Sequence, residues 1–227
     1  GCIFTSSHQT TNDGLYGQPT YANDTSHIQF NYSAYNWSFL KSDFTIDMRQ
    51  PFSVEWEIVN FFDNGQADSP TTGVQLAMGQ VQSGYDLTPP DPGYQTKLAL
   101  LRNGNVDPAK IFSRAFGTLV NGSEDYFVDQ TIFYNDGPDN KGGTETTPSA
   151  FRLKLELTPA RYFAGYISVD DGATWQLVCE KEDFVWTAEE AARDRVQNAW
   201  VIIAASNTVG SRCVTGDVIV RHGTLGT

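Results

Sequence analysis

Basic residues are scarce in this chain. Its 227 residues include 15 Lys and Arg against 27 Asp and Glu, which gives a formal net charge of −12. Proteins that bind nucleic acid use Lys and Arg to displace counterions from phosphates, so this balance argues against general nucleic-acid binding. It argues equally against binding to an anionic membrane surface. Neither nucleic acid nor a membrane surface is therefore expected as a partner.

Long apolar runs and clustered cysteines are also missing. No segment approaches the roughly 18 apolar residues of a membrane span. The only cysteines are Cys2, Cys179 and Cys213, and their wide spacing excludes a cysteine-based zinc site and a Cys-x-x-Cys redox pair. The signatures Gly-x-Ser-x-Gly, His-Glu-x-x-His, the Walker loop and the dinucleotide fingerprint are absent as well. Serine-esterase, zinc-protease, kinase and Rossmann functions are therefore not supported.

The chain is rich in short alternating runs. Hydrophobic residues make up 40% and aromatic residues 13%, enough for a sizeable core. Residues 151–157 (Phe-Arg-Leu-Lys-Leu-Glu-Leu) put apolar side chains on one face and charged ones on the other, which predicts a half-buried antiparallel strand. Further strands are expected at 44–48, 54–58, 73–81, 96–102, 128–134, 162–169, 176–180, 199–206 and 217–222.

One helix is expected at about residues 188–197, where Thr187 and Glu190 have capping-box spacing. Many short strands with one short peripheral helix indicate an all-β fold, an antiparallel β-sandwich or jelly roll. The polar, turn-rich residues 1–27 are expected to form an N-terminal arm, and residues 28–227 a single β-sandwich domain.

A hairpin motif occupies residues 168–175, Ser-Val-Asp-Asp-Gly-Ala-Thr-Trp. The carboxylate of Asp170 is expected to accept hydrogen bonds from the turn, and Gly172 supplies the positive φ that a tight turn needs. Trp175 is expected to pack back over the connection and to be largely buried. The motif resembles the Asp-box hairpin of sialidases, but a propeller needs several copies and this chain has one.

The wider context resembles another fold. Residues 151–178 have the order strand, turn, strand, Trp hairpin and strand, and the chain closes with apolar runs at 199–206 and 216–221. Together with 52–56 and 73–79, these segments resemble the concanavalin-A-like, laminin-G-like sandwich. The resemblance covers residues 44–222 and is closest to the β-sandwich found C-terminal to the catalytic unit of family-43 glycoside hydrolases. That family includes glycan binders, lyases, glucanases and spacer domains, so the fold does not settle function.

The resemblance implies a disulfide. Cys179 follows the Trp hairpin and Cys213 precedes the last strand, and in a laminin-G-like sandwich those strands can come near each other. In a secreted setting this predicts a Cys179–Cys213 bridge, with Cys2 left over.

Glu55 and Glu57 lie two apart on one expected strand and so point to the same face. Glucanases of this superfamily place carboxylates on a strand that lines the concave face, which makes the pair a weak candidate for catalysis. Their pattern, Glu-x-Asp-x-x-Glu, is incomplete here because Val59 and Asn60 stand where the second carboxylate belongs. A solvated or cross-strand-paired face and polar glycan contacts remain open alternatives.

Tyr162 and Tyr166 share a strand face and are candidates for stacking on sugar rings, with ordinary surface tyrosines as the alternative. In this superfamily the ligand meets the concave face or adjacent loops. The expected carbohydrate-binding residues are therefore Tyr162, Tyr166, Glu55, Glu57 and Lys154. Residues 161–166 also resemble a strand of alginate lyases, although no Gln-x-His strand accompanies it.

The sequence also contains a candidate calcium site and candidate glycosylation sites. The turn with Asp136, Asp139 and Asn140 is rich in the hard oxygen ligands that calcium takes, and a turn held by Asx hydrogen bonds is the alternative. Sequons at Asn23, Asn31, Asn36 and Asn121 predict a glycosylated protein.

The expected function is that of a secreted or cell-surface carbohydrate-binding β-sandwich without catalysis, which recognises a polysaccharide. Two alternatives stay open: a polysaccharide hydrolase or lyase on the same fold, and a structural or adhesion domain of a surface or viral protein.

Overall fold

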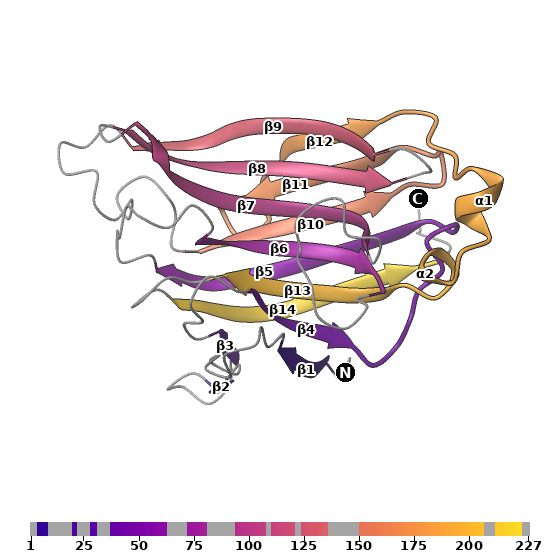
Figure 1. Ribbon diagram of the computed structural model, residues 1–227, viewed down its shortest axis with the longest axis horizontal. Coiled ribbons are helices and arrows are strands. Elements are labelled where there is room, and N and C mark those ends of the chain that lie inside the picture. The colour runs from indigo at the N-terminus through magenta and orange to yellow at the C-terminus, as the bar shows by residue number, and fades with distance from the viewer. Residues whose placement is uncertain are drawn as a thin grey trace.

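Two seven-stranded antiparallel sheets lie as two layers, with a short helical segment at one end (Figure 1). The structure is a computed structural model that describes residues 4–8, 20–21, 28–30, 37–62, 72–80, 94–107, 110–120, 124–135, 150–206 and 212–223. The all-β sandwich expected from the sequence is confirmed.

The first sheet has the strand order β1-β4-β13-β6-β7-β8-β9. Its strands are β1 (Phe4–His8), β4 (Trp37–Ser42), β13 (Trp200–Ser206), β6 (Thr72–Gly79), β7 (Tyr94–Asp107), β8 (Lys110–Val120) and β9 (Glu124–Asn135). The second sheet has the order β12-β11-β10-β5-β14-β3-β2. Its strands are β12 (Gln176–Lys181), β11 (Phe163–Ser168), β10 (Phe151–Leu157), β5 (Phe52–Phe62), β14 (Arg212–His222), β3 (Ile28–Phe30) and β2 (Thr20–Tyr21).

The core lies between the sheets and follows the period-two pattern. Strand β10 alternates between buried and half-buried residues along its whole length, as its sequence predicts. The neighbouring β5 turns Phe52, Val54, Trp56 and Ile58 into the same layer, each at most 1% exposed. Burying each such side chain contributes about 1.5–3 kcal/mol. The opposite faces of these two strands therefore lie outside the core.

Strands β6 and β13 differ, because both of their faces are buried. Leu76 and Ile203 point into the core and are at most 2% exposed, yet Gln75 and Ile202, which point the other way, are at most 1% exposed. The run Val-Ile-Ile-Ala-Ala at 201–205 lacks the alternation of a half-exposed strand, which fits burial on both sides.

The helical segment near residue 190 is confirmed but divided. It consists of two single turns, α1 (Ala188–Ala191) and α2 (Asp194–Gln197), instead of one helix over 188–197. Thr187 caps α1 by accepting the Glu190 N–H at 3.2 Å, as the capping-box spacing predicts. The helix breaks at Arg193, whose backbone is extended (φ −75°, ψ 140°). From there its guanidinium reaches back to Glu190, with Nε at 3.1 Å from Oε1.

The strand expected at 44–48 is wrong. Within this segment only Ile46 pairs, through an isolated bridge to Ala199, and a turn follows in which the Gln50 N–H donates to the Asp47 carbonyl. The segment carries the chain from β4 in one sheet to β5 in the other. Its buried Ile46 and Met48 close this end of the core, which is why the sequence alternates without forming a strand.

Arg161 fixes the β10–β11 hairpin to this crossing segment. It has a left-handed backbone (φ 64°), a conformation that costs energy for a residue with a side chain. Its guanidinium offsets that cost by donating to the carbonyls of Phe184 and Arg49, both at 3.0 Å. Its own carbonyl accepts the Phe184 N–H at 2.8 Å.

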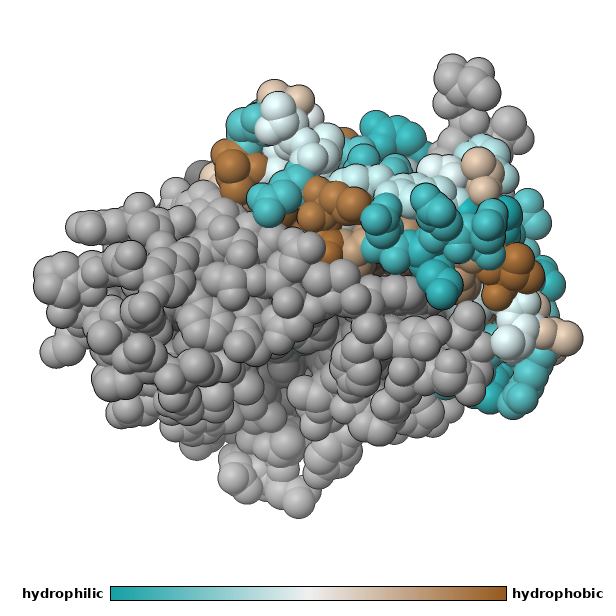
Figure 2. Space-filling model, turned by 90° about the horizontal axis from the view of Figure 1, so that it is seen from above, coloured by the Kyte–Doolittle hydropathy of each residue, from teal (hydrophilic) through white to brown (hydrophobic). Residues whose placement is uncertain are grey.

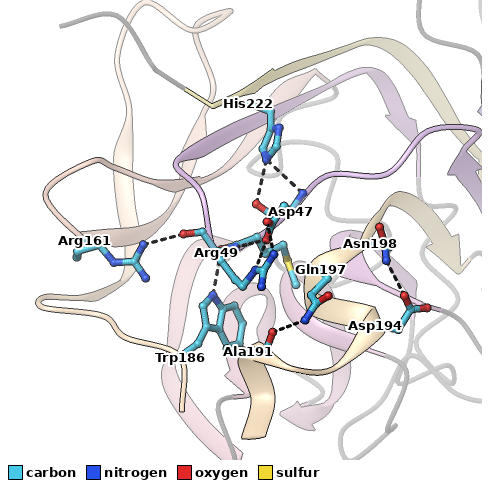
Figure 3. A network of polar contacts seen from close by, with 10 residues as sticks. Asp47, Arg49, Arg161, Trp186, Ala191, Asp194, Gln197, Asn198 and His222 are labelled. Carbon is cyan, nitrogen blue, oxygen red and sulfur yellow. Dashed lines mark hydrogen bonds and ion pairs between the residues drawn. The ribbon is translucent and has the colours of Figure 1, made fainter. Parts of the chain in front are cut away.

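Two further side chains anchor the same segment (Figure 3). The Trp186 indole N–H donates to the Met48 carbonyl at 3.0 Å. His222, at the end of β14, places Nε2 at 2.9 Å from the Asp47 carbonyl oxygen. The crossing is thus tied to the hairpin, to the loop before α1 and to the last strand.

The predicted Cys179–Cys213 disulfide is wrong. Both residues are free, buried thiols. Cys179 lies on β12 and Cys213 on β14, and β11, β10 and β5 separate these strands. Four inter-strand steps of about 4.8 Å each hold the thiols far beyond the ~7 Å Cα separation that a bridge tolerates. Burial raises the pKa of Cys179 to about 12 and also raises the pKa of Cys213.

Several expectations lie outside the described residues. They are the sequons at Asn23, Asn31, Asn36 and Asn121 and the candidate calcium turn with Asp136, Asp139 and Asn140. Within the expected arm, β1 pairs with β4 and β2 pairs with β3. The division into arm and single domain stays a prediction.

Candidate functional site

The outer face of the second sheet carries the predicted glycan-contact residues. Cross-strand partners there form three rows. One row joins Ile219, Glu55, Lys154, Tyr166 and Leu177. The second joins Arg221, Ser53, Glu156, Ala164 and Glu180. The third joins Glu57, Arg152 and Ser168. We call this face the platform; Tyr162 and Trp175 complete it.

Two aromatic rings and one ammonium group form the centre of the platform. Lys154 Nζ lies 4.4 Å from the ring centroid of Tyr166 and 4.7 Å from that of Trp175. The two rings meet edge to face, with centroids 6.5 Å apart. Both aromatic residues are half-buried, so Trp175 is more exposed than the hairpin motif predicts. A cation over aromatic faces is a stabilising contact, and the rings keep apolar surface toward solvent.

The tyrosines are hydrogen-bonded phenols. Tyr162 donates to the Glu180 carboxylate, and this contact raises the pKa of Tyr162 to about 12. Partial burial, with the nearby Glu156 carboxylate second, raises the pKa of Tyr166. Both phenols are therefore neutral at physiological pH.

Each of the two candidate catalytic carboxylates has an arginine partner. Glu55 accepts from Arg221 Nη1 at 2.9 Å, and Glu57 lies 3.4 Å from Arg152 Nη2. Glu57 also accepts the Asp217 N–H at 3.1 Å, where β14 bulges opposite it. The geometry matches the cross-strand-paired face that the sequence left open.

Glycine is required at this bulge. A Cβ at Gly216 would lie 2.7 Å from Glu57 Cδ and 2.8 Å from Val59 Cγ2. The missing side chain lets the Glu57 carboxylate fold over the backbone of β14 and bond it. Glu57 thus holds the bulge in place.

Arg152 joins the platform to the Trp hairpin. Its Nε and Nη2 lie 2.9 and 2.7 Å from Asp171 Oδ1, while Nη2 also faces Glu57. Asp171 has a left-handed backbone (φ 59°), which turns its carboxylate back toward the sheet. Arg152 therefore holds the hairpin in place, so that Trp175, which the hairpin carries, lies over the platform.

The hairpin is held as its motif predicts. Asp170 Oδ1 accepts the Thr174 N–H at 2.8 Å, and Oδ2 accepts the Thr174 hydroxyl at 2.6 Å. The Ser168 hydroxyl donates to Asp170 Oδ1 at 2.8 Å and accepts the Gly172 N–H at 2.8 Å. These bonds, those from Thr174 above all, lower the pKa of Asp170.

We expect Asp170→Asn to remove a pH-dependent part of the stability. Because the folded-state pKa of Asp170 is lowered, its contribution is present above the unfolded pKa of about 3.9. It is lost as the pH falls through the folded pKa. Thermal melts between pH 2 and 7 should show the variant less stable at neutral pH and the two curves converging in acid.

Asp43→Asn is the matched control, because it removes the same charge from an exposed aspartate outside the hairpin and leaves the Thr174 contacts intact. Curves for wild type and Asp170→Asn that stay parallel down to pH 2 would contradict the role of the Asp170 carboxylate.

The predicted residues do meet on one face, together with some that sequence reasoning missed. Glu55, Glu57, Lys154, Tyr162 and Tyr166 all belong to the platform. Sequence reasoning assigned no role there to Arg221 or Glu180. Position 180 lies three residues after Leu177, outside the period-two alternation of β12, because β12 bulges opposite Gly165 and Tyr166.

Two features are absent from the described residues. No group of three or more His, Cys, Asp or Glu side chains there is placed to hold a metal ion. No helix in that part of the chain is long and apolar enough to cross a membrane.

Comparison with known proteins supports the fold. No family profile and no curated protein matches the sequence. Among solved structures, the chain is similar to the potassium-bound Emp46p carbohydrate recognition domain, with a TM-score of 0.58, 11% identity, and 91% of this chain and 88% of that chain covered. It is equally similar to a legume lectin-like domain from Entamoeba histolytica, with a TM-score of 0.59, 11% identity, and 93% and 89% covered.

A third similar structure is the exoplasmic/lumenal domain of VIP36 bound to calcium and Man3GlcNAc. Its TM-score is 0.54 at 9% identity, with 100% of this chain and 86% of that chain covered. At these identities the likeness shows the fold, a legume-lectin-like sandwich. The finer resemblance to the family-43 sandwich stays a prediction.

Proposed function

We propose that this chain is a secreted or cell-surface carbohydrate-binding domain and that the platform is its glycan-contact surface. The observation that carries the proposal is the cluster of Tyr166, Trp175 and Lys154. It presents two partly exposed rings on a face that also carries charged side chains, among them Glu55, Glu156 and Arg152. Aromatic faces stack on the C–H faces of sugar rings, and flanking carboxylates accept hydrogen bonds from sugar hydroxyls.

The form of the surface supports an extended ligand. Side chains of the platform come from five neighbouring strands, and small residues such as Ser53 and Ala164 are buried beneath the long ones. A polysaccharide chain fits such a surface. Figure 2 looks from above onto the edge of the two layers, where the described residues in view are mostly hydrophilic, with smaller hydrophobic patches among them.

The proposal is for binding without catalysis. A glycosidase needs one carboxyl group with a raised pKa and a second group as nucleophile or base. Glu55 and Glu57 lie on one strand and are each paired with an arginine instead, which matches a structural role for both carboxylates. A reducing-sugar assay on any glycan that binds is expected to show no turnover.

The proposal also includes secretion to the outside or surface of the cell and a bound calcium ion. The similar VIP36 structure is an exoplasmic/lumenal domain, and the four sequons favour a secreted chain. Calcium at the turn with Asp136, Asp139 and Asn140 is proposed on the chemistry of its oxygen ligands. A rise in melting temperature on adding calcium to metal-free protein would support it.

A glycan array followed by titration calorimetry tests the platform. Trp175→Ala is expected to weaken binding by about 0.5–1.5 kcal/mol, because one stacking ring is lost. The chain offers a matched control on the other sheet, where Lys41 Nζ lies 3.6 Å from the ring centroid of Trp200. Trp200→Ala removes a similar cation–aromatic pair and is expected to leave binding unchanged.

Circular dichroism of both variants would separate loss of binding from loss of folding. Equal effects of Trp175→Ala and Trp200→Ala on glycan affinity, or binding by neither the wild type nor the variants, would overturn the assignment of the platform.

A further inference from the structure

We propose that the platform discriminates against acidic glycans, because its carboxylates already form ion pairs with Arg152, Lys154 and Arg221. This inference rests on the proposed function and concerns the chemical class of the ligand. It assigns two carboxylates as the residues that set the discrimination: Glu156, which pairs with Lys154, and Glu55, which lies across from Lys154 on β5 and pairs with Arg221.

The cations of the platform are already engaged. Lys154, with a side chain 16% exposed, lies between the two rings and 3.4 Å from Glu156 Oε2. Arg152 is 18% exposed and lies between Asp171 and Glu57. Arg221 is more open, at 53%, but pairs with Glu55 at 2.9 Å. A uronate or sulfate that approached the rings would have to displace one of these carboxylates.

The balance of charge points the same way. Three cations on and beside the platform, Arg152, Lys154 and Arg221, stand against five carboxylates, Glu55, Glu57, Glu156, Asp171 and Glu180. Like charges brought together across an interface repel each other and weaken binding. Carboxylates accept hydrogen bonds from the hydroxyls of an uncharged sugar without that repulsion.

The test compares soluble neutral glucan and mannan with polygalacturonate of similar chain length, at 0.05 and 0.5 M NaCl. Wild type is expected to bind polygalacturonate at least about tenfold more weakly than the neutral glycan that it binds best. Glu55→Gln/Glu156→Gln removes two repelling charges and frees Lys154. The ratio of acidic to neutral affinity is expected to rise about tenfold in this variant, and the gain should shrink at high salt.

Asp43→Asn/Glu189→Gln is the charge-matched control, because it also removes two charges, from an exposed residue after β4 and from a glutamate that is 77% exposed on α1, both outside the platform. It should leave the ratio unchanged. Wild-type binding of polygalacturonate as tight as that of the neutral glycans, and lost in Trp175→Ala, would overturn the discrimination and leave the glycan-binding surface intact. Failure of the wild type to bind any glycan would overturn the proposed function itself. An equal gain in the Asp43→Asn/Glu189→Gln control would also overturn the inference, because net charge alone would explain it.

Discussion

Replacing Trp56 with alanine is expected to lower the free energy of unfolding by about 3–5 kcal/mol. Trp56 is among the largest fully buried side chains and has 0% exposure. It projects from β5 into the layer between the sheets, and its indole N–H donates to the Thr215 hydroxyl on β14 at 2.6 Å. The substitution removes that bond and opens a cavity that close-packed neighbours fill only in part.

Urea unfolding followed by far-UV circular dichroism would measure the change, with the slope m expected to stay constant. Trp56→Phe separates the two contributions, because it keeps most of the ring but leaves the Thr215 hydroxyl without its donor, at a cost of about 1–3 kcal/mol. A loss below about 1 kcal/mol for Trp56→Ala would contradict the central place of this residue in the core.

Glu190→Ala is the second substitution with a large expected effect, about 2–4 kcal/mol of unfolding free energy. This carboxylate is 1% exposed and faces two guanidinium groups, with Arg193 Nε at 3.1 Å and Arg195 Nη2 at 3.4 Å. Removing one partner of a buried ion pair leaves the other charge uncompensated. The side chain of Arg193 is 39% exposed, so water reduces the penalty on that side.

The neighbouring Glu189 offers the control. It lies 2.8 Å from Arg193 as well, but its side chain is 77% exposed. Ion pairs at the surface contribute about 0–1 kcal/mol, so Glu189→Ala should change the urea midpoint little. Similar losses for the two alanine variants would show that burial of Glu190 does not matter.

Local pattern was sufficient to predict the elements whose period is regular. The alternation in β10 predicts both the strand and its buried face, and Thr187 with Glu190 predicts where α1 begins. Strand β8 was not predicted from the sequence, and the reason is physical. Along its sequence, residues 110–120, apolar and polar residues come in pairs instead of alternating, so the period-two signal of a half-buried strand is missing.

Strand order is the part that local pattern cannot supply. The predicted disulfide assumed that β12 and β14 approach each other, whereas β5 and β10 pair with each other and keep them apart. The same pairing of β5 with β10 is what brings Glu55 beside Lys154. Sequence spacing predicts which residues share a strand face, but not which strands lie next to one another.

The reactivity of the two buried thiols can be used to measure how often the structure around them opens. A buried cysteine reacts with a thiol reagent only when the structure around it opens, so its labelling rate measures that opening. Cys179 lies on the edge strand β12, and Cys213 lies on β14 between β5 and β3. In a Cys2→Ser background, fraying of the sheet edge would expose Cys179 alone, whereas complete unfolding would expose both. Because Cys179 and Cys213 lie too far apart to form a disulfide, each thiol can be labelled independently, and the two rates distinguish local opening from complete unfolding.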